Sequence, residues 1–134
     1  MEFLEKVKSK LSLEKNKKVK IGLALGGGGA RGYAHLGAIK AFEEYGINFD
    51  FIAGTSAGAF TGAFYASGWT FEQMYSIAKE FRRKDIRRNK IPFMPSSTEG
   101  IQEIIVNNLG DIDIKDTKIP FCAVAVDVLS TQEC

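Results

Sequence analysis

The chain lacks several features that would place it in other protein classes. Its 134 residues include one histidine and two cysteines. That cysteine count does not suggest a disulfide framework, and His35 is the only histidine a Ser-His-acid triad could use. No apolar run reaches the roughly 18 residues of a membrane-spanning helix, and the N-terminus lacks the apolar core of a signal peptide. We therefore expect a cytoplasmic protein. The net charge of +2 indicates no partner by itself.

What is present is typical of one globular domain. Hydrophobic residues make up 45% and charged residues 25% of the chain, which excludes a disordered class. Strand-like apolar runs, the first of them over Val19–Leu25, alternate with helical periodicity, and this predicts an α/β fold with a mainly parallel sheet. We expect the last strand over Ile119 to Val128, with Cys122 buried inside it. A capping box from Thr70 to Gln73 predicts the start of a helix.

Charge is concentrated in two segments. Residues 1–20 hold seven lysines and three glutamates, and residues 1–18 predict a basic amphipathic helix ahead of the domain at 19–134. That helix either rests on an anionic membrane surface or is a solvated terminal helix. A second basic cluster precedes the apolar loop Ile91–Pro95, which fits a lipid-facing lid or a solvated helix end. Its members are Arg82, Arg83, Lys84, Arg87, Arg88 and Lys90. No aromatic residues interleave with them, so we expect no nucleic-acid partner.

One pentapeptide indicates a nucleophile. From Gly54 to Gly58 it places Ser56 between two glycines, directly after the apolar run Phe51-Ile52-Ala53. This is the pattern of a nucleophile elbow, in which a strand turns sharply into a helix and exposes the serine oxygen. The serine then takes a positive φ, and the glycines avoid a collision across the turn. A small-residue turn without catalysis is the alternative.

A glycine run offers a second part of a site. Gly26 to Gly29 follow the predicted strand Val19–Leu25, and helical periodicity begins at Tyr33. Such a run exposes backbone N–H groups that can hold a phosphate or the oxyanion of an acyl transfer. Residues Gly27 to Gly32 also satisfy the dinucleotide pattern G-x-G-x-x-G. A dinucleotide site needs an acidic residue at the carboxyl end of the second strand, whereas Asp50 lies at its amino end. No Walker lysine closes the run.

The two loops are expected to lie side by side, because a right-handed crossover places their strands next to each other. One loop supplies a nucleophile and the other supplies amide donors. Together they favour acyl transfer over nucleotide binding.

These motifs resemble the patatin-like phospholipase family. The resemblance covers roughly Lys18 to Glu133 and includes His35-Leu36-Gly37, Ala59 and the strand before Asp127. It implies a three-layer α/β/α fold and a lipid acyl hydrolase with a Ser-Asp dyad, without cofactor or metal. Ser56 would be the nucleophile, acting on a lipid or ester substrate. The backbone amides of Gly27, Gly28 and Gly29 would form the oxyanion hole. The motif-supporting residues would be Arg31, Gly32, Gly54 and Gly58.

The chain departs from the family pattern in one respect. The D-G-G or D-G-A motif that carries the dyad aspartate does not occur in the sequence. We therefore expect the N-terminal portion of a longer catalytic domain, with a natural short product as the alternative. A truncated sheet would also favour self-association. Within the chain, Asp127 remains a substitute base and His35 is expected to be a packed helical histidine. A silent lipid- or acyl-binding domain, and a nucleotide-binding domain, are the competing functions.

Overall fold

The computed structural model describes residues 4–7, 9, 19–87 and 98–133. Most of the basic N-terminal segment lies outside the described residues. So do the loop Ile91–Pro95 and the side chains of the second basic cluster. The predictions made for these segments stay predictions.

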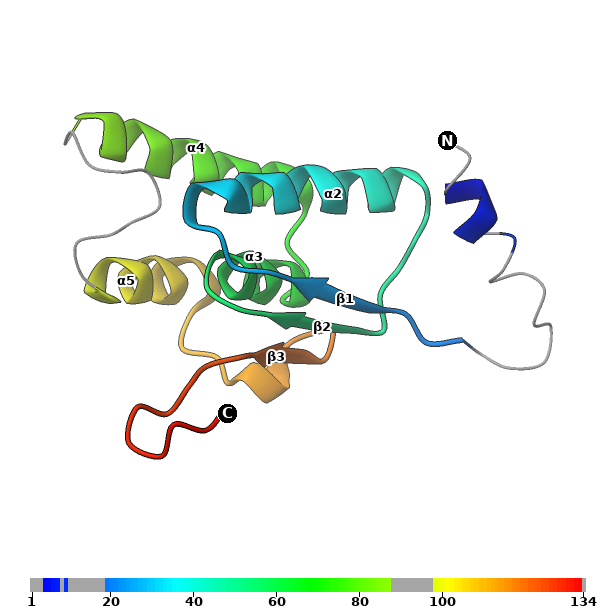
Figure 1. Cartoon of the computed structure of the whole chain (residues 1–134). Coiled ribbons are helices and arrows are strands. Elements are labelled where there is room, and N and C mark those ends of the chain that lie inside the picture. The colour runs from blue at the N-terminus through cyan, green and yellow to red at the C-terminus, as the bar shows by residue number, and fades with distance from the viewer. Residues whose placement is uncertain (1–3, 8, 10–18, 88–97, 134) are drawn as a thin grey trace.

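Three parallel strands form the sheet, in the order β1-β2-β3 (Figure 1). They are β1 (Gly22–Leu25), β2 (Phe51–Gly54) and β3 (Phe121–Ala123). Leu25 pairs with Gly54, and Gly54 pairs with Ala123. This register brings the carboxyl ends of all three strands into one row. The predicted α/β class with a parallel sheet is confirmed.

Helices connect the strands. The turn η1 (Gly29–Gly32) and helix α2 (Tyr33–Glu44) follow β1, and α3 (Ala57–Ala66) follows β2. The connection to β3 contains α4 (Phe71–Arg87), α5 (Thr98–Leu109) and η2 (Ile114–Asp116). Helix α4 begins as predicted, because the Thr70 amide donates to Gln73 Oε1 at 2.9 Å and the Gln73 amide donates to Thr70 Oγ1 at 3.4 Å.

Helix α3 is the center of the core. It contacts all three strands, and its Phe64 is buried with Ile52 of β2 and Ile39 of α2. Small residues let α3 approach the sheet closely. A Cβ on Gly62 of α3 would lie only 2.9 Å from the ring of Phe121 in β3. Because α3 continues directly from β2, this packing fixes the turn between them.

The two faces of the sheet differ in exposure. Leu25 and Ile52 are buried on the α3 side, whereas Ala24, Phe51 and Cys122 are exposed. The prediction that Cys122 is buried was therefore wrong. Successive strand residues point to opposite faces, and Phe121 is the one that meets α3.

The last strand is shorter than predicted. Its final bond to β2 runs from the Val124 amide to the Gly54 carbonyl, at 2.8 Å. Beyond Gly54 the chain of β2 turns into the elbow and offers no further ladder partner. Val126 instead forms an antiparallel bridge with Glu133.

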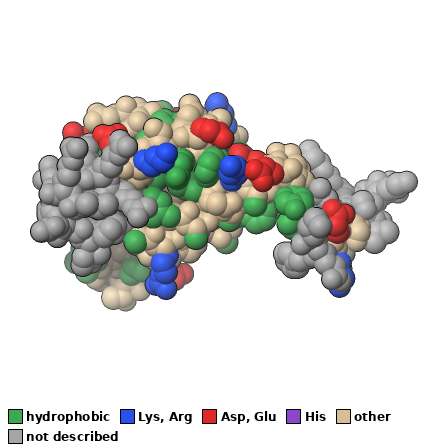
Figure 2. Space-filling view, turned by 90° about the horizontal axis from the view of Figure 1, so that it is seen from above, with side chains coloured by type: hydrophobic (Ala, Val, Ile, Leu, Met, Phe, Trp, Pro, Cys, Tyr) green, Lys and Arg blue, Asp and Glu red, His purple; other side chains and the backbone are tan. Residues whose placement is uncertain are grey.

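Charges of both signs are mixed on the face formed by α2 and α4. Figure 2 looks onto this face from above and shows hydrophobic side chains between scattered basic and acidic ones. Lys40 Nζ of α2 lies 4.9 Å from the center of the Phe71 ring of α4, and Phe71 stacks on Tyr75. In the described part of the chain, the helices are all too short or too polar to cross a membrane.

Candidate active site

Ser56 occupies the sharp turn between β2 and α3. Its backbone has φ 52° and ψ −124°, and its side chain is exposed. Thr131 is the only other described non-glycine residue with a positive φ. Such a conformation costs about 1–3 kcal/mol and persists only where the surrounding structure enforces it. The predicted elbow conformation is confirmed.

The glycines on either side of Ser56 are required for different reasons. A Cβ on Gly54 would lie 2.5 Å from the carbonyl oxygen of Gly58, across the turn, as the sequence predicted. A Cβ on Gly58 would instead strike the carbonyl of Leu25 at the end of β1, and would lie 2.6 Å from the Gly26 oxygen. Gly58 therefore lets the first turn of α3 approach the neighboring strand.

The glycine loop lies directly beside the serine. A Cβ on Gly27 would be 3.3 Å from Ser56 Cβ, and the Thr55 amide donates to the Leu25 carbonyl at 3.1 Å. At the other end of the loop, a Cβ on Gly32 would be 2.7 Å from Ala57 Cβ. The structure thus brings together the two loops that the sequence analysis placed side by side.

The glycine loop is held in a tight turn. Gly29 has φ 54°, and the Arg31 amide donates to the Gly28 carbonyl at 3.0 Å. The Arg31 side chain packs beside Gly28, since a Cβ there would be 3.5 Å from Arg31 Nε. In the described part of the chain, the amides of Gly27 and Gly28 donate to no backbone acceptor. These two N–H groups are therefore available to a ligand.

His35 was expected to pack on its own helix, but its side chain also contacts the glycine loop. Its Nε2 lies 2.7 Å from the carbonyl oxygen of Gly26, the first residue of the glycine loop. Because a carbonyl only accepts, Nε2 carries the proton and donates it. The side chain joins α2 to the loop, and that bond was not predicted from the sequence.

The two carboxylates that the sequence analysis considered both have structural partners. Asp127 accepts hydrogen bonds from the Ser130 hydroxyl at 2.7 Å and the Leu129 amide at 3.0 Å. These bonds lower the pKa of Asp127, whereas a general base for a serine needs a raised pKa. Asp50 accepts from the Ile21 amide at 2.8 Å, at the amino ends of the strands. It is thus at the wrong end of the sheet to hold a ribose.

Ser56 itself has no base beside it among the described residues. Its hydroxyl makes no hydrogen bond to any residue that the structure describes. The described part of the chain therefore places an exposed serine beside free amide donors, and no described carboxylate is hydrogen-bonded to that serine.

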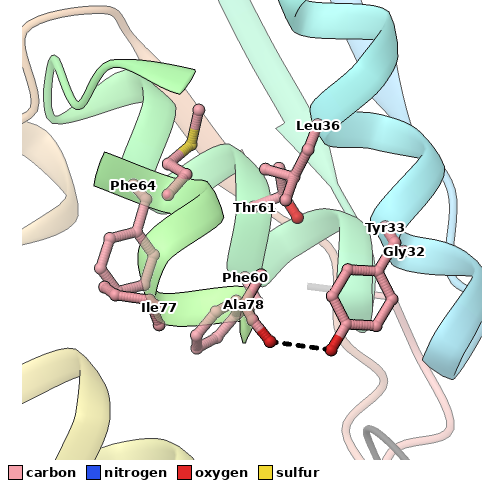
Figure 3. A pocket seen from close by; sticks show the side chains of 9 residues that line it. Gly32, Tyr33, Leu36, Phe60, Thr61, Phe64, Ile77 and Ala78 are labelled. Atoms are coloured by element: carbon pink, nitrogen blue, oxygen red, sulfur yellow. Dashed lines mark hydrogen bonds between the residues drawn. The ribbon is translucent and has the colours of Figure 1, made fainter. Parts of the chain in front are cut away.

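Two hollows lie near α3, and neither contains Ser56. Figure 3 shows the first, where apolar side chains of α2, α3 and α4 converge and the Tyr33 hydroxyl donates to the Ala78 carbonyl at 3.0 Å. Its free volume of about 20 Å³ holds about one water molecule, which is far too small for an acyl chain. The second hollow, of about 230 Å³, is lined by Ser67 and Trp69, at the opposite end of α3.

Known proteins share this sequence pattern. A family model described as "Patatin-like phospholipase" matches residues 23–124. "Lysophospholipase nte1" of Aspergillus fumigatus is 59% identical over 61 residues, and "Lysophospholipase NTE1" of Yarrowia lipolytica is 54% identical over 61 residues. Each match covers 46% of this chain and only 4% of the fungal protein.

A solved structure is similar to the chain as well. It is the complex of full-length SpcU with full-length ExoU from the type III secretion system of Pseudomonas aeruginosa. The match is 27% identical, covers 73% of this chain and 20% of that one, and has a TM-score of 0.43.

Proposed function

The chain belongs to the patatin-like phospholipase family, and we propose that it is the nucleophile-bearing part of a serine acyl hydrolase that acts on lipid esters. The observation that carries the proposal is the position of Ser56. It is held at φ 52° on the elbow, and its Cβ is 3.3 Å from where a Cβ on Gly27 would be. A nucleophile and free amide donors thus meet at the carboxyl edge of the sheet. The lysophospholipase relatives support a lipid substrate.

The proposed reaction is an acyl transfer in two steps. Ser56 Oγ attacks the carbonyl carbon of the ester while its proton passes to a base. The amides of Gly27, Gly28 and Gly29 stabilize the resulting oxyanion. When the oxyanion collapses, the bond to the alcohol breaks and the alcohol leaves with a proton. Water then attacks the acyl-enzyme, and Ser56 regains its hydrogen as the carboxylic acid departs.

The base is proposed to be an aspartate outside these 134 residues. Two observations support this assignment. The Ser56 hydroxyl lacks a partner among the described residues, and Asp127 is engaged by Ser130 with its pKa lowered. A Ser-Asp dyad also needs no histidine, which agrees with the bond of His35 to Gly26. On this proposal the 134-residue chain alone binds lipid or acyl groups without turning them over.

The N-terminal segment bears on the location of the protein and on its partners. We propose a cytoplasmic protein that contacts anionic membranes at its periphery. The seven lysines among residues 1–20 support this contact. Vesicle co-sedimentation tests it: binding to vesicles with anionic lipid should exceed binding to neutral ones, and equal binding would contradict it.

A fluorophosphonate probe tests the proposed chemistry, because it modifies only an activated serine. In the polypeptide that includes the base, peptide mass spectrometry should locate the label on Ser56, and Ser56→Ala should abolish it. The 134-residue chain should stay unlabeled. Labeling at another serine would contradict the proposal, and saturable binding of NAD or ATP would support a nucleotide-binding domain instead.

A further inference from the structure

His35 and Gly58 lie far apart in the sequence, but both meet the carbonyl oxygen of Gly26. The His35 ring nitrogen Nε2 is 2.7 Å from that oxygen. On the other side, a Cβ on Gly58 would be only 2.6 Å from it. The oxygen therefore lies between the first turn of α2 and the first turn of α3, where it accepts a hydrogen bond and has little room to move.

Fixing this carbonyl also fixes the next amide. The peptide bond between Gly26 and Gly27 is planar, so its C=O and N–H point in opposite directions. With the oxygen held toward His35, the N–H of Gly27 points away from α2. Gly27 is the loop residue that lies beside Ser56, and its amide donates to no backbone acceptor in the described part of the chain.

This loop needs an external restraint. A run of four glycines, Gly26 to Gly29, has more backbone freedom than any other sequence of that length. An oxyanion hole works only if its donors are already aimed before the charge develops. A hydrogen bond from a side chain on a regular helix supplies such a restraint, because α2 is itself packed into the core through Leu36 and Ile39.

We propose that His35 is a positioning residue for the oxyanion hole: its Nε2–H holds the Gly26–Gly27 peptide so that the Gly27 amide is preset for the transition state. The inference rests on the proposed function. It gives the histidine a role that requires neither proton transfer nor contact with the substrate. The bond needs only a donor at Nε2, which both the neutral Nε2–H tautomer and the imidazolium provide.

Two substitutions of similar shape separate the effect of losing the hydrogen-bond donor from the effect of changing the side-chain volume. His35→Gln keeps an N–H donor at similar reach, whereas His35→Met is of similar length and has none. Glutamine and methionine have similar helix propensities. In the polypeptide that includes the base, His35→Met should lower kcat about tenfold with KM nearly unchanged. That is less than the 10²–10³-fold loss of a whole oxyanion donor. His35→Gln should restore most of the rate.

A sulfur-substituted substrate reports on the oxyanion hole itself. A thionoester develops its charge on sulfur, which accepts hydrogen bonds poorly, so a preset hole favors the oxygen ester. The ratio of kcat for the ester to kcat for the thionoester should fall in His35→Met and recover in His35→Gln. A merely structural role would lower both rates together and leave the ratio unchanged.

The outcomes separate this proposal from the proposed function. If Ser56→Ala abolishes turnover but His35→Met keeps the wild-type kcat and substrate ratio, the positioning role is wrong and the proposed function stands. If His35→Met unfolds while His35→Gln folds, the bond serves the fold and the positioning role is overturned. If Ser56→Ala retains turnover, both proposals fall. A tenfold loss of kcat with a reduced ratio, rescued by His35→Gln, supports the positioning role.

Discussion

At the scale of single residues, the site depends on backbone positions that tolerate little change. Ser56 is held at φ 52°, which costs about 1–3 kcal/mol for a residue with a Cβ. The cost is tolerated because α3 packs across the whole sheet and leaves the turn no other path. The strain supports the proposed nucleophilic role of Ser56, since glycine would adopt this backbone conformation without strain.

Replacing Ser56 with glycine therefore separates stability from function. Ser56→Gly should raise the free energy of unfolding by about 1 kcal/mol, because glycine adopts a positive φ without strain. It should also abolish labeling by the fluorophosphonate probe. Urea denaturation followed by circular dichroism measures the first effect. A loss of stability in Ser56→Gly would show that the hydroxyl has a structural role that the account omits.

Two glycine-to-alanine substitutions provide a matched pair. Gly58→Ala should destabilize the fold by more than about 1–3 kcal/mol, because its Cβ would strike the backbone of Leu25. Gly37→Ala, on the open side of α2 with nothing within 4 Å, should stabilize it by about 0.5–1 kcal/mol. Chemical denaturation of both variants checks the prediction. Equal effects would mean that the close approach of α3 to β1 is not required.

At the scale of elements, the sequence predicted those features that depend on residues close together in the chain. The capping box at Thr70, the elbow at Ser56 and the parallel strands were predictable because each depends on neighboring residues or on periodicity. The short β3 and the exposed Cys122 were not, because both depend on where β2 stops and which face α3 covers. The bond of His35 to Gly26 was also missed, since a helical histidine carries no sequence signal for a carbonyl partner outside its helix.

The contact between α2 and α4 makes stability depend on pH. Burial, and next the charge of Glu72, raise the pKa of Glu43. A carboxyl whose pKa is raised in the folded state destabilizes the fold when ionized, at pH values above that pKa. The penalty is absent below the unfolded pKa, near 4.3.

Glu43→Gln should therefore increase stability at pH 7, and the gain should disappear below about pH 4. Thermal unfolding across this range measures the gain. Glu44→Gln is the control on the same helix, since Glu44 forms an exposed ion pair with Lys40 at 3.9 Å and such pairs contribute about 0–1 kcal/mol. A pH-independent gain in Glu43→Gln would contradict the electrostatic explanation.

At the scale of the whole molecule, one face of the sheet is covered and the other is open in the described part of the chain. Helix α3 contacts all three parallel strands from one face. Parallel sheets are usually covered on both faces, but Phe51 is 47% exposed here. An apolar face of this kind favors association.

We expect the 134-residue chain to self-associate through this face. Sedimentation velocity should show concentration-dependent association, and Phe51→Thr should weaken it. Val106→Thr is the control, because Val106 is similarly exposed, at 44%, on α5. A monomer at all concentrations, or an equal effect of the two substitutions, would contradict this expectation.

Ser56 is proposed to be the nucleophile of an ester hydrolase whose base lies outside these residues. The most direct test is the rate of short-chain ester hydrolysis at equal concentration. It compares the 134-residue chain, a polypeptide extended through a downstream D-G-G or D-G-A motif, and the extended polypeptide with Ser56→Ala. We expect turnover in the extended polypeptide alone. With Ser56→Ala, any residual rate should stay within about 10³–10⁴-fold of the uncatalyzed rate, which oxyanion binding alone can provide. If the 134-residue chain hydrolyzes the ester as fast as the extended polypeptide, or if the Ser56→Ala variant exceeds that residual rate, Ser56 is not the nucleophile of such a dyad.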